Sequence, residues 1–230
     1  DTTAHFLDTV GQFARIVNDT GLVHLRRLVG DEITGTENKA GLVEKYFCLS
    51  MENTTALEDI ELGDDGLRVG DKHVSVHTLS ELDALPGKVG TDCRYERLST
   101  DKSDCKLSFA SPVGLLLSCN HLYNQYIFLD DSGENLQRFE KNARNMQSLS
   151  KYSRSNQINK EWIDLYLNDA HSFGLTSVRA HCNIIAWTDN PMEVKNMRND
   201  VGSQIAMMEC KPRHNTVDAA TLYWLSLIHI

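Results

Sequence analysis

The sequence has no long apolar run, no closely paired cysteines and none of the short motifs of common nucleotide and metal enzymes. Its longest apolar stretch, 113–117, is far shorter than the roughly 20 residues that a membrane-spanning helix needs. The 230 residues are 41% hydrophobic and 24% charged, which is the balance of an ordinary globular protein. We therefore expect one substantial domain or two small ones.

Several nucleotide-binding and catalytic motifs are absent. The sequence contains no GxxxxGK[ST] loop, no GxGxxG, no GxSxG elbow and no HExxH. Each of these motifs is local and easily seen, so its absence is informative. The adjacent carboxylates in "GDDG", Asp64 and Asp65, need no chemistry to explain them, because this composition is typical of a turn. We predict no catalytic residue, no cofactor site and no metal ligand in this chain.

The cysteine and histidine side chains are the candidate metal ligands of this sequence. The six cysteines are scattered without a CxxC pair, so we expect reduced thiols, mostly buried, as in a cytosolic protein. His73 and His77 share one face of an expected strand, and Cys210 with His214 forms a looser pair. Structural zinc needs four converging ligands, so half-exposed histidines are the favoured interpretation. A small metal- or thiol-dependent enzyme is the least favoured hypothesis.

The net charge of −9 is unevenly distributed along the chain. Residues 1–90 carry eight basic and sixteen acidic side chains, whereas the remainder is nearly balanced. Neither half has the basic excess of a dedicated nucleic-acid binder.

The first ninety residues predict a small acidic α+β subdomain. The apolar stripe of Phe6, Val10, Phe13 and Val17 predicts a helix that ends at Gly21. The sequence "LVHLRRLV" then favours a strand, and "NKAGLVEKYFCLS" favours a second helix.

The apolar period changes to two between residues 60 and 79, with Gly-Asp turns between short β-branched runs. This pattern predicts a small antiparallel sheet. The stretch "ALPGKVGTD", 84–92, is the best candidate for the boundary between the two subdomains.

Residues 91–224 predict a second subdomain in which helices pack on one face of a sheet. Buried strands are expected over "SFASPVGLLLSCNHLYNQYIFLDD", with a bend near Asn120 and His121, and over "TSVRAHCNIIAW" and "SQIAMMEC". Helices are expected over 133–156, 156–174, 191–202 and 215–224. The expected fold class is α+β, that is, mixed α/β, with antiparallel or mixed sheets and two subdomains.

The two long helices each predict an inward apolar face. Leu136, Phe139, Ala143 and Met146 share one side of the first helix. In the second helix, the residues expected to face inward are Ile158, Trp162, Leu165, Tyr166 and Phe173.

Basic residues occupy the opposite side of the first of these helices and form the candidate interaction surface. It could meet an acidic partner, nucleic acid or anionic lipid, although such a face is often only solvated. Lys211 and Arg213 add a weaker signal near a strand end. The candidate surface consists of Arg138, Lys141, Arg144, Lys151 and Arg154.

Three long phrases carry a resemblance to a known family. They are "RYERLSTDKSDCKLSFASPVGLLLSCNHLYNQYIFLD", "NQINKEWIDLYLNDAHSFGLTSVRAHCNIIAW" and "AMMECKPRHNTVDAATLYW". The chain resembles the TraG-type conjugation-system ATPase of Bacteroidales conjugative transposons, the cytoplasmic motor of a type IV secretion apparatus. The resemblance runs from "FARIVNDTG" to Trp224.

The resemblance places this stretch before the motor domain, so ATP and magnesium would bind downstream and no catalytic residue is carried over. It implies a non-catalytic segment that docks the motor to secretion-channel proteins or to its own subunits during DNA transfer. Such a segment is cytoplasmic and peripheral to the inner membrane, in an ATPase that forms a homo-oligomer. The alternative is a stand-alone module that binds nucleic acid or protein through the basic helix face.

The last six residues, 225–230, are expected to be non-native. In similar proteins "TLYW" continues into a loop containing glycine and proline, whereas "LSLIHI" is what the transposase adapter CTGTCTCTTATACACATC of sequencing libraries encodes. We exclude these residues from fold reasoning and expect a chain truncated at both ends.

Overall fold

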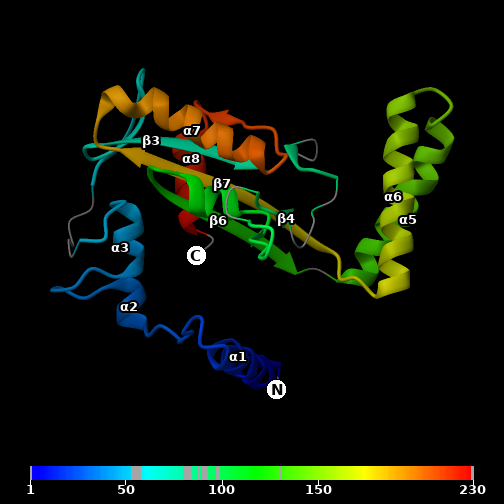
Figure 1. Cartoon of the computed structure of the whole chain (residues 1–230), viewed down its shortest axis with the longest axis horizontal. Coiled ribbons are helices and arrows are strands. Elements are labelled where there is room, and N and C mark those ends of the chain that lie inside the picture. The colour runs from blue at the N-terminus through cyan, green and yellow to red at the C-terminus, as the bar shows by residue number, and fades with distance from the viewer. Residues whose placement is uncertain are drawn as a thin grey trace. The chain divides into compact units, whose positions relative to one another are not determined.

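The computed structural model describes residues 2–52, 58–79, 84–87, 89, 93–96, 99–129 and 131–228 (Figure 1). Within them, helices combine with a mainly antiparallel sheet, which confirms the expected α+β class. The helices are α1 (Thr2–Asp19), α2 (Gly30–Thr34), α3 (Leu42–Phe47), α4 (Ser111–Leu116), α5 (Ser132–Leu149), α6 (Arg154–Phe173), η2 (Pro191–Glu193), α7 (Val194–Met207) and α8 (Ala219–Ile228). The strands are β1 (Ile60–Gly63), β2 (Gly66–Val69), β3 (Lys72–Leu79), β4 (Cys93–Arg94), β5 (Lys106–Leu107), β6 (Asn120–Leu129), β7 (Val178–Thr188) and β8 (His214–Asn215).

The chain forms two compact units. The first comprises Asp1–Glu61, Arg68–Asp71 and Leu227–Ile230, and the second comprises Leu62–Leu67 and Lys72–Ser226. Strand β3 lies before the expected boundary at 84–92, yet it belongs to the second unit and pairs with β7. Residues 88 and 90–92 of that boundary stretch lie outside the described residues, and the division into 1–90 and 91–224 stays a prediction.

The main sheet has the strand order β1-β2-β3-β7-β6, and β8 pairs with β3. Strands β3 and β7 are antiparallel from His73↔Thr188 to Leu79↔Cys182. Strand β6 pairs with the other edge of β7, from Asn120↔Trp187 to Leu129↔Val178. The antiparallel sheet expected between residues 60 and 79 is therefore present, and it forms one side of a larger sheet.

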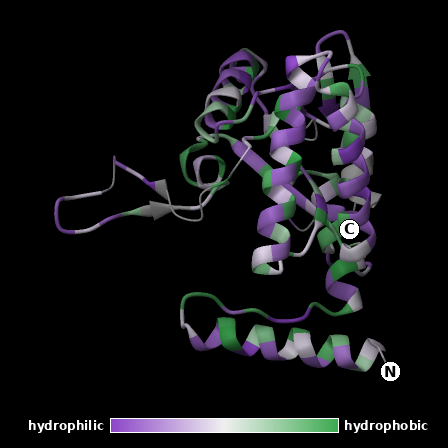
Figure 2. Ribbon diagram, turned by 90° about the vertical axis from the view of Figure 1, so that its right-hand side faces the viewer, coloured by the Kyte–Doolittle hydropathy of each residue, from purple (hydrophilic) through white to green (hydrophobic). Residues whose placement is uncertain are grey.

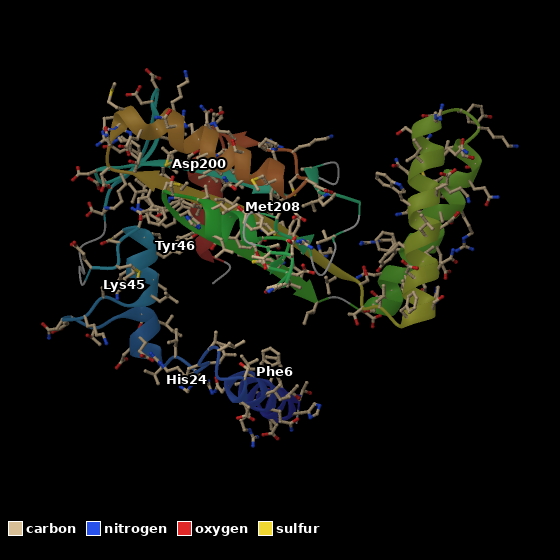
Figure 3. All side chains as sticks on the ribbon, in the orientation of Figure 1. Phe6, His24, Lys45, Tyr46, Asp200 and Met208 are labelled. Carbon is tan, nitrogen blue, oxygen red and sulfur yellow. The ribbon has the colours of Figure 1, made fainter. Side chains whose placement is uncertain are left out.

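Helix α7 covers the face of the sheet that carries the core. Cys182, Ile184 and Ala186 occupy alternate positions along β7 and pack against α7. Met208, which follows the last turn of α7, belongs to the same core (Figure 3). The other buried members are Leu79, Val113, Met197, Val201, Ile205 and Cys210.

Helix α1 in the first unit has the predicted bounds, and the left-handed Gly21 follows it (φ 70°). Hydrophobic and hydrophilic residues form bands along it in Figure 2. None of its residues is buried, and Phe6 and Phe13 are 63% and 61% exposed. The expected apolar stripe therefore exists but is not covered by the described residues.

The strand expected at 22–29 is wrong. These residues have no regular secondary structure, and the side chain of Asn18 provides hydrogen bonds that a strand partner would otherwise make. The Leu25 amide donates to Asn18 Oδ1 at 2.5 Å, and Asn18 Nδ2 donates to the Leu25 carbonyl at 3.1 Å. The helix expected over "NKAGLVEKYFCLS" is confirmed as α3, although it is shorter than this stretch. Helix α2, which precedes it, was not predicted from the sequence.

In the second unit one strand prediction is wrong, and the one or two strands expected from residue 108 are confirmed only as β6. "SQIAMMEC" lies mostly in α7, because Val201, Gln204, Ile205 and Met208 are buried at helical spacing. Part of the stretch before residue 120 forms α4, with Pro112 in its first turn, where the missing amide hydrogen costs nothing. The bend expected near Asn120 is instead the start of β6.

Candidate interaction surface

The candidate surface lies on a helical hairpin formed by α5 and α6. Helix α5 begins at the N-cap Asp131, whose side chain accepts a hydrogen bond from the Glu134 amide at 3.0 Å. Helix α6 ends at Gly174, which is left-handed with φ 62°. Because Leu129 pairs with Val178, the hairpin is inserted between two neighbouring strands of the sheet, in the place of a β-turn.

Small and aromatic side chains hold the two helices together. Ala143 on α5 and Ala170 on α6 are buried. The rings of Phe139 and Tyr166 meet edge-on, with their centroids 5.2 Å apart. The sequence therefore identified the inward face of α5 correctly at Phe139 and Ala143.

The inward face expected for α6 is largely wrong. Of its five members, Ile158, Trp162, Leu165 and Phe173 are exposed, with exposed fractions between 41% and 75%. The residues that are buried are Leu167 and Ala170. At about 100° per residue, these buried positions lie roughly a third of a turn or more from the exposed stripe. Helix α6 thus has two apolar faces, of which one packs on α5.

The exposed apolar stripe of α6 adjoins an apolar groove of about 570 Å³. Phe139, Trp162 and Tyr166 line it from the hairpin, and Leu85 and Val178 line it from the flanking chain. The groove therefore extends the exposed stripe into a continuous apolar surface.

The basic residues predicted from the sequence are all exposed. Arg138, Lys141 and Arg144 follow one another on the side of α5 turned away from Ala143. Helix α5 stops at Leu149, before Lys151, and Arg154 is the first residue of α6. Lys151 and Arg154 therefore lie at the connection between the two helices and do not share the basic face of α5. None of the five forms an ion pair with a carboxylate of the described residues.

The histidines considered as metal ligands do not converge. His73 is partly exposed, as expected, but His77 is 2% exposed, which corrects the expectation of a half-exposed side chain. Burial, followed by His214 and Arg198, lowers the pKa of His77 to about 3. Among the residues described, no group of three or more potential ligands is placed to hold a metal ion.

Cys48, Cys105, Cys119, Cys182 and Cys210 are free thiols, and Cys48, Cys182 and Cys210 are buried. Burial raises the pKa of the Cys182 and Cys210 thiols, which reduces their thiolate population. These thiols behave as core side chains and are not activated nucleophiles.

Together, these features define an α+β chain with a surface suited to binding. No helix in the described part of the chain is both long and apolar enough to span a membrane. Comparison with protein-family models and with curated proteins finds no match to this chain.

Proposed function

We propose that this chain is a non-catalytic docking segment of a conjugation ATPase of the TraG type. In this role it connects the motor to the secretion channel or to neighbouring subunits during DNA transfer between cells. ATP and magnesium are bound by a downstream motor domain. The segment works in the cytoplasm, peripheral to the inner membrane.

The main observation that supports the proposal is the exposed surface of the α5–α6 hairpin. Helix α6 exposes an apolar stripe, and α5 exposes basic residues that form no ion pair with the described residues. Exposed aromatic and arginine side chains are the residue types that dominate protein interfaces. Trp162 lies at the groove, while Arg138 and Arg144 lie on the basic face of α5. Apolar anchors and a charged rim are both components of protein-binding surfaces.

The test is charge reversal of Lys141, Arg144 and Lys151 to glutamate in the full-length ATPase. Reversal converts attraction for an acidic partner into repulsion, so we expect DNA transfer to fall by about tenfold or more. The exposed side chains leave the hydrophobic core untouched, so the circular dichroism spectrum should not change.

A matched control reverses Arg27, Lys102 and Lys195, which are exposed elsewhere and alter the net charge equally. The control should transfer DNA at the unsubstituted level. Transfer at that level in the α5 variant as well would remove the interface claim.

Nucleic-acid binding is the second candidate, because the five basic residues of the candidate surface form no ion pair with a carboxylate of the described residues. Binding through them would weaken steeply with salt concentration as counterions are released. Absence of DNA binding at low salt would eliminate this candidate and leave protein docking.

A further inference from the structure

A polar hollow of about 450 Å³ lies in the second unit, away from the helical hairpin. Asp64 and Asp65 line it from the turn between β1 and β2, and Arg198 lines it from α7. His214 and Thr216 line it from β8 and the residue after it. The hollow therefore combines one arginine with two carboxylates.

Arg198 has unused hydrogen-bonding capacity. Its Nε atom is buried and has no acceptor among the described residues. No carboxylate of the described chain lies within ion-pair distance of its guanidinium, although Asp64 and Asp65 line the same hollow. A buried donor without an acceptor is destabilising, so such a group requires an explanation.

The turn beside Arg198 is built around a glycine. Gly66 has φ 109°, and a Cβ atom placed there would lie 3.1 Å from Nη2 of Arg198. The absence of a side chain allows the guanidinium to lie close to the turn. Glycine at this position thus serves both the backbone conformation and the placement of Arg198.

His214, which lines the hollow, lies next to the buried His77. The rings of His77 and His214 are 5.2 Å apart, and Ser75 Oγ lies 2.9 Å from His77 Nε2. Nδ1 of His77 is buried and has no partner among the described residues. Burial and the charge of Arg198 lower the pKa of His214, which is consistent with a positive field at this place.

We propose that this hollow binds a phosphate group that still carries a proton, held by the guanidinium of Arg198. A guanidinium presents parallel N–H donors that match two oxygens of an oxyanion. The carboxylates of Asp64 and Asp65 can only accept hydrogen bonds, so they favour an anion that also has an O–H donor. Inorganic phosphate has that donor at neutral pH and a phosphate monoester has it in its monoanionic form, whereas sulfate and phosphodiesters do not.

The ligand series tests this chemistry on the whole chain by isothermal titration calorimetry near neutral pH. Inorganic phosphate is compared with glycerol 3-phosphate, dimethyl phosphate and sulfate. We expect phosphate to bind at least about tenfold more tightly than sulfate or dimethyl phosphate, because the last two leave the aspartates facing an anion without a donor. Glycerol 3-phosphate binding as tightly as phosphate identifies a monoester group as ligand, and much weaker binding identifies free phosphate. Sulfate binding as tightly as phosphate would overturn the proposal.

Substitutions test the two halves of the site. Arg198→Gln should weaken phosphate binding by at least about tenfold, whereas Arg27→Gln, at an exposed arginine outside both proposed surfaces, should leave it unchanged. Asn can donate as well as accept, so Asp64→Asn with Asp65→Asn should abolish the preference for phosphate over sulfate. The aspartate variant keeps the proposal testable if Arg198→Gln does not fold. Equal weakening by Arg27→Gln and Arg198→Gln would show general surface attraction and refute the site, without bearing on the docking function proposed for the hairpin.

Discussion

The buried His77 makes the stability of the second unit depend on pH. Its side chain is enclosed by the sheet and α7, with Ser75, His214 and Arg198 as its polar neighbours. Burial is the largest cause of its low pKa, and the nearby His214 and Arg198 lower it further. The imidazole is therefore neutral in the folded protein near neutral pH.

The size of the effect follows from the two pKa values. In the unfolded chain His77 takes up a proton as the pH falls below 6.5, but in the folded chain it does so only near pH 3. The unfolded state therefore binds more protons between these values, so stability falls as the pH falls. From about pH 7.5 to about pH 5, the free energy of unfolding should decrease by roughly 2 kcal/mol from this residue alone. The lowered pKa of His214 acts in the same direction.

Urea denaturation at the two pH values measures this decrease, and His77→Gln isolates the contribution of the residue. Glutamine keeps a polar group beside Ser75 but does not titrate. The variant should lose roughly 2 kcal/mol less than the unsubstituted chain on acidification. His5→Gln, on the exposed helix α1, should leave the decrease unchanged. An equal decrease in His77→Gln and the unsubstituted chain would refute the reasoning.

Two further predictions concern the helical hairpin, and hydrogen exchange of its amides measures both. Leu167→Ala should destabilise the hairpin by about 2 kcal/mol or more because Leu167 is buried, while Leu165→Ala should cost less than about 0.5 kcal/mol because Leu165 is 62% exposed. Equal costs would show that the two faces of α6 are assigned wrongly. Gly174→Ala should cost about 1 kcal/mol, because the left-handed backbone is strained with a Cβ atom although no neighbour obstructs it. An unchanged exchange rate in this variant would contradict a left-handed Gly174.

The sequence predicted those helices and strands whose positions are determined by a few neighbouring residues. The extent of α1, the end of α6 at Gly174 and the alternation along β7 each follow from a few neighbouring residues. The wrong strand at 203–210 shows the limit, because short apolar runs fit a strand or a helix. In this segment, the packing of Ile205 and Val201 against the sheet favours a helix over a strand.

The candidate sites also differ in how far the sequence could predict them. The basic residues of α5 could be predicted because helical spacing alone places them on one side. The exposed stripe of α6 could not, since apolar residues on two sides of a helix do not reveal which side meets the partner helix. The hollow around Arg198 was missed because its members come from a turn, a helix and a strand that only the folded sheet brings together.

Sequencing the source DNA beyond the codon for Trp224 tests the central claim most directly. A docking segment of a conjugation ATPase predicts that the native reading frame continues into a motor domain with a GxxxxGK[ST] loop. A genuine "LSLIHI" followed by a stop codon would contradict this account and favour a stand-alone binding module.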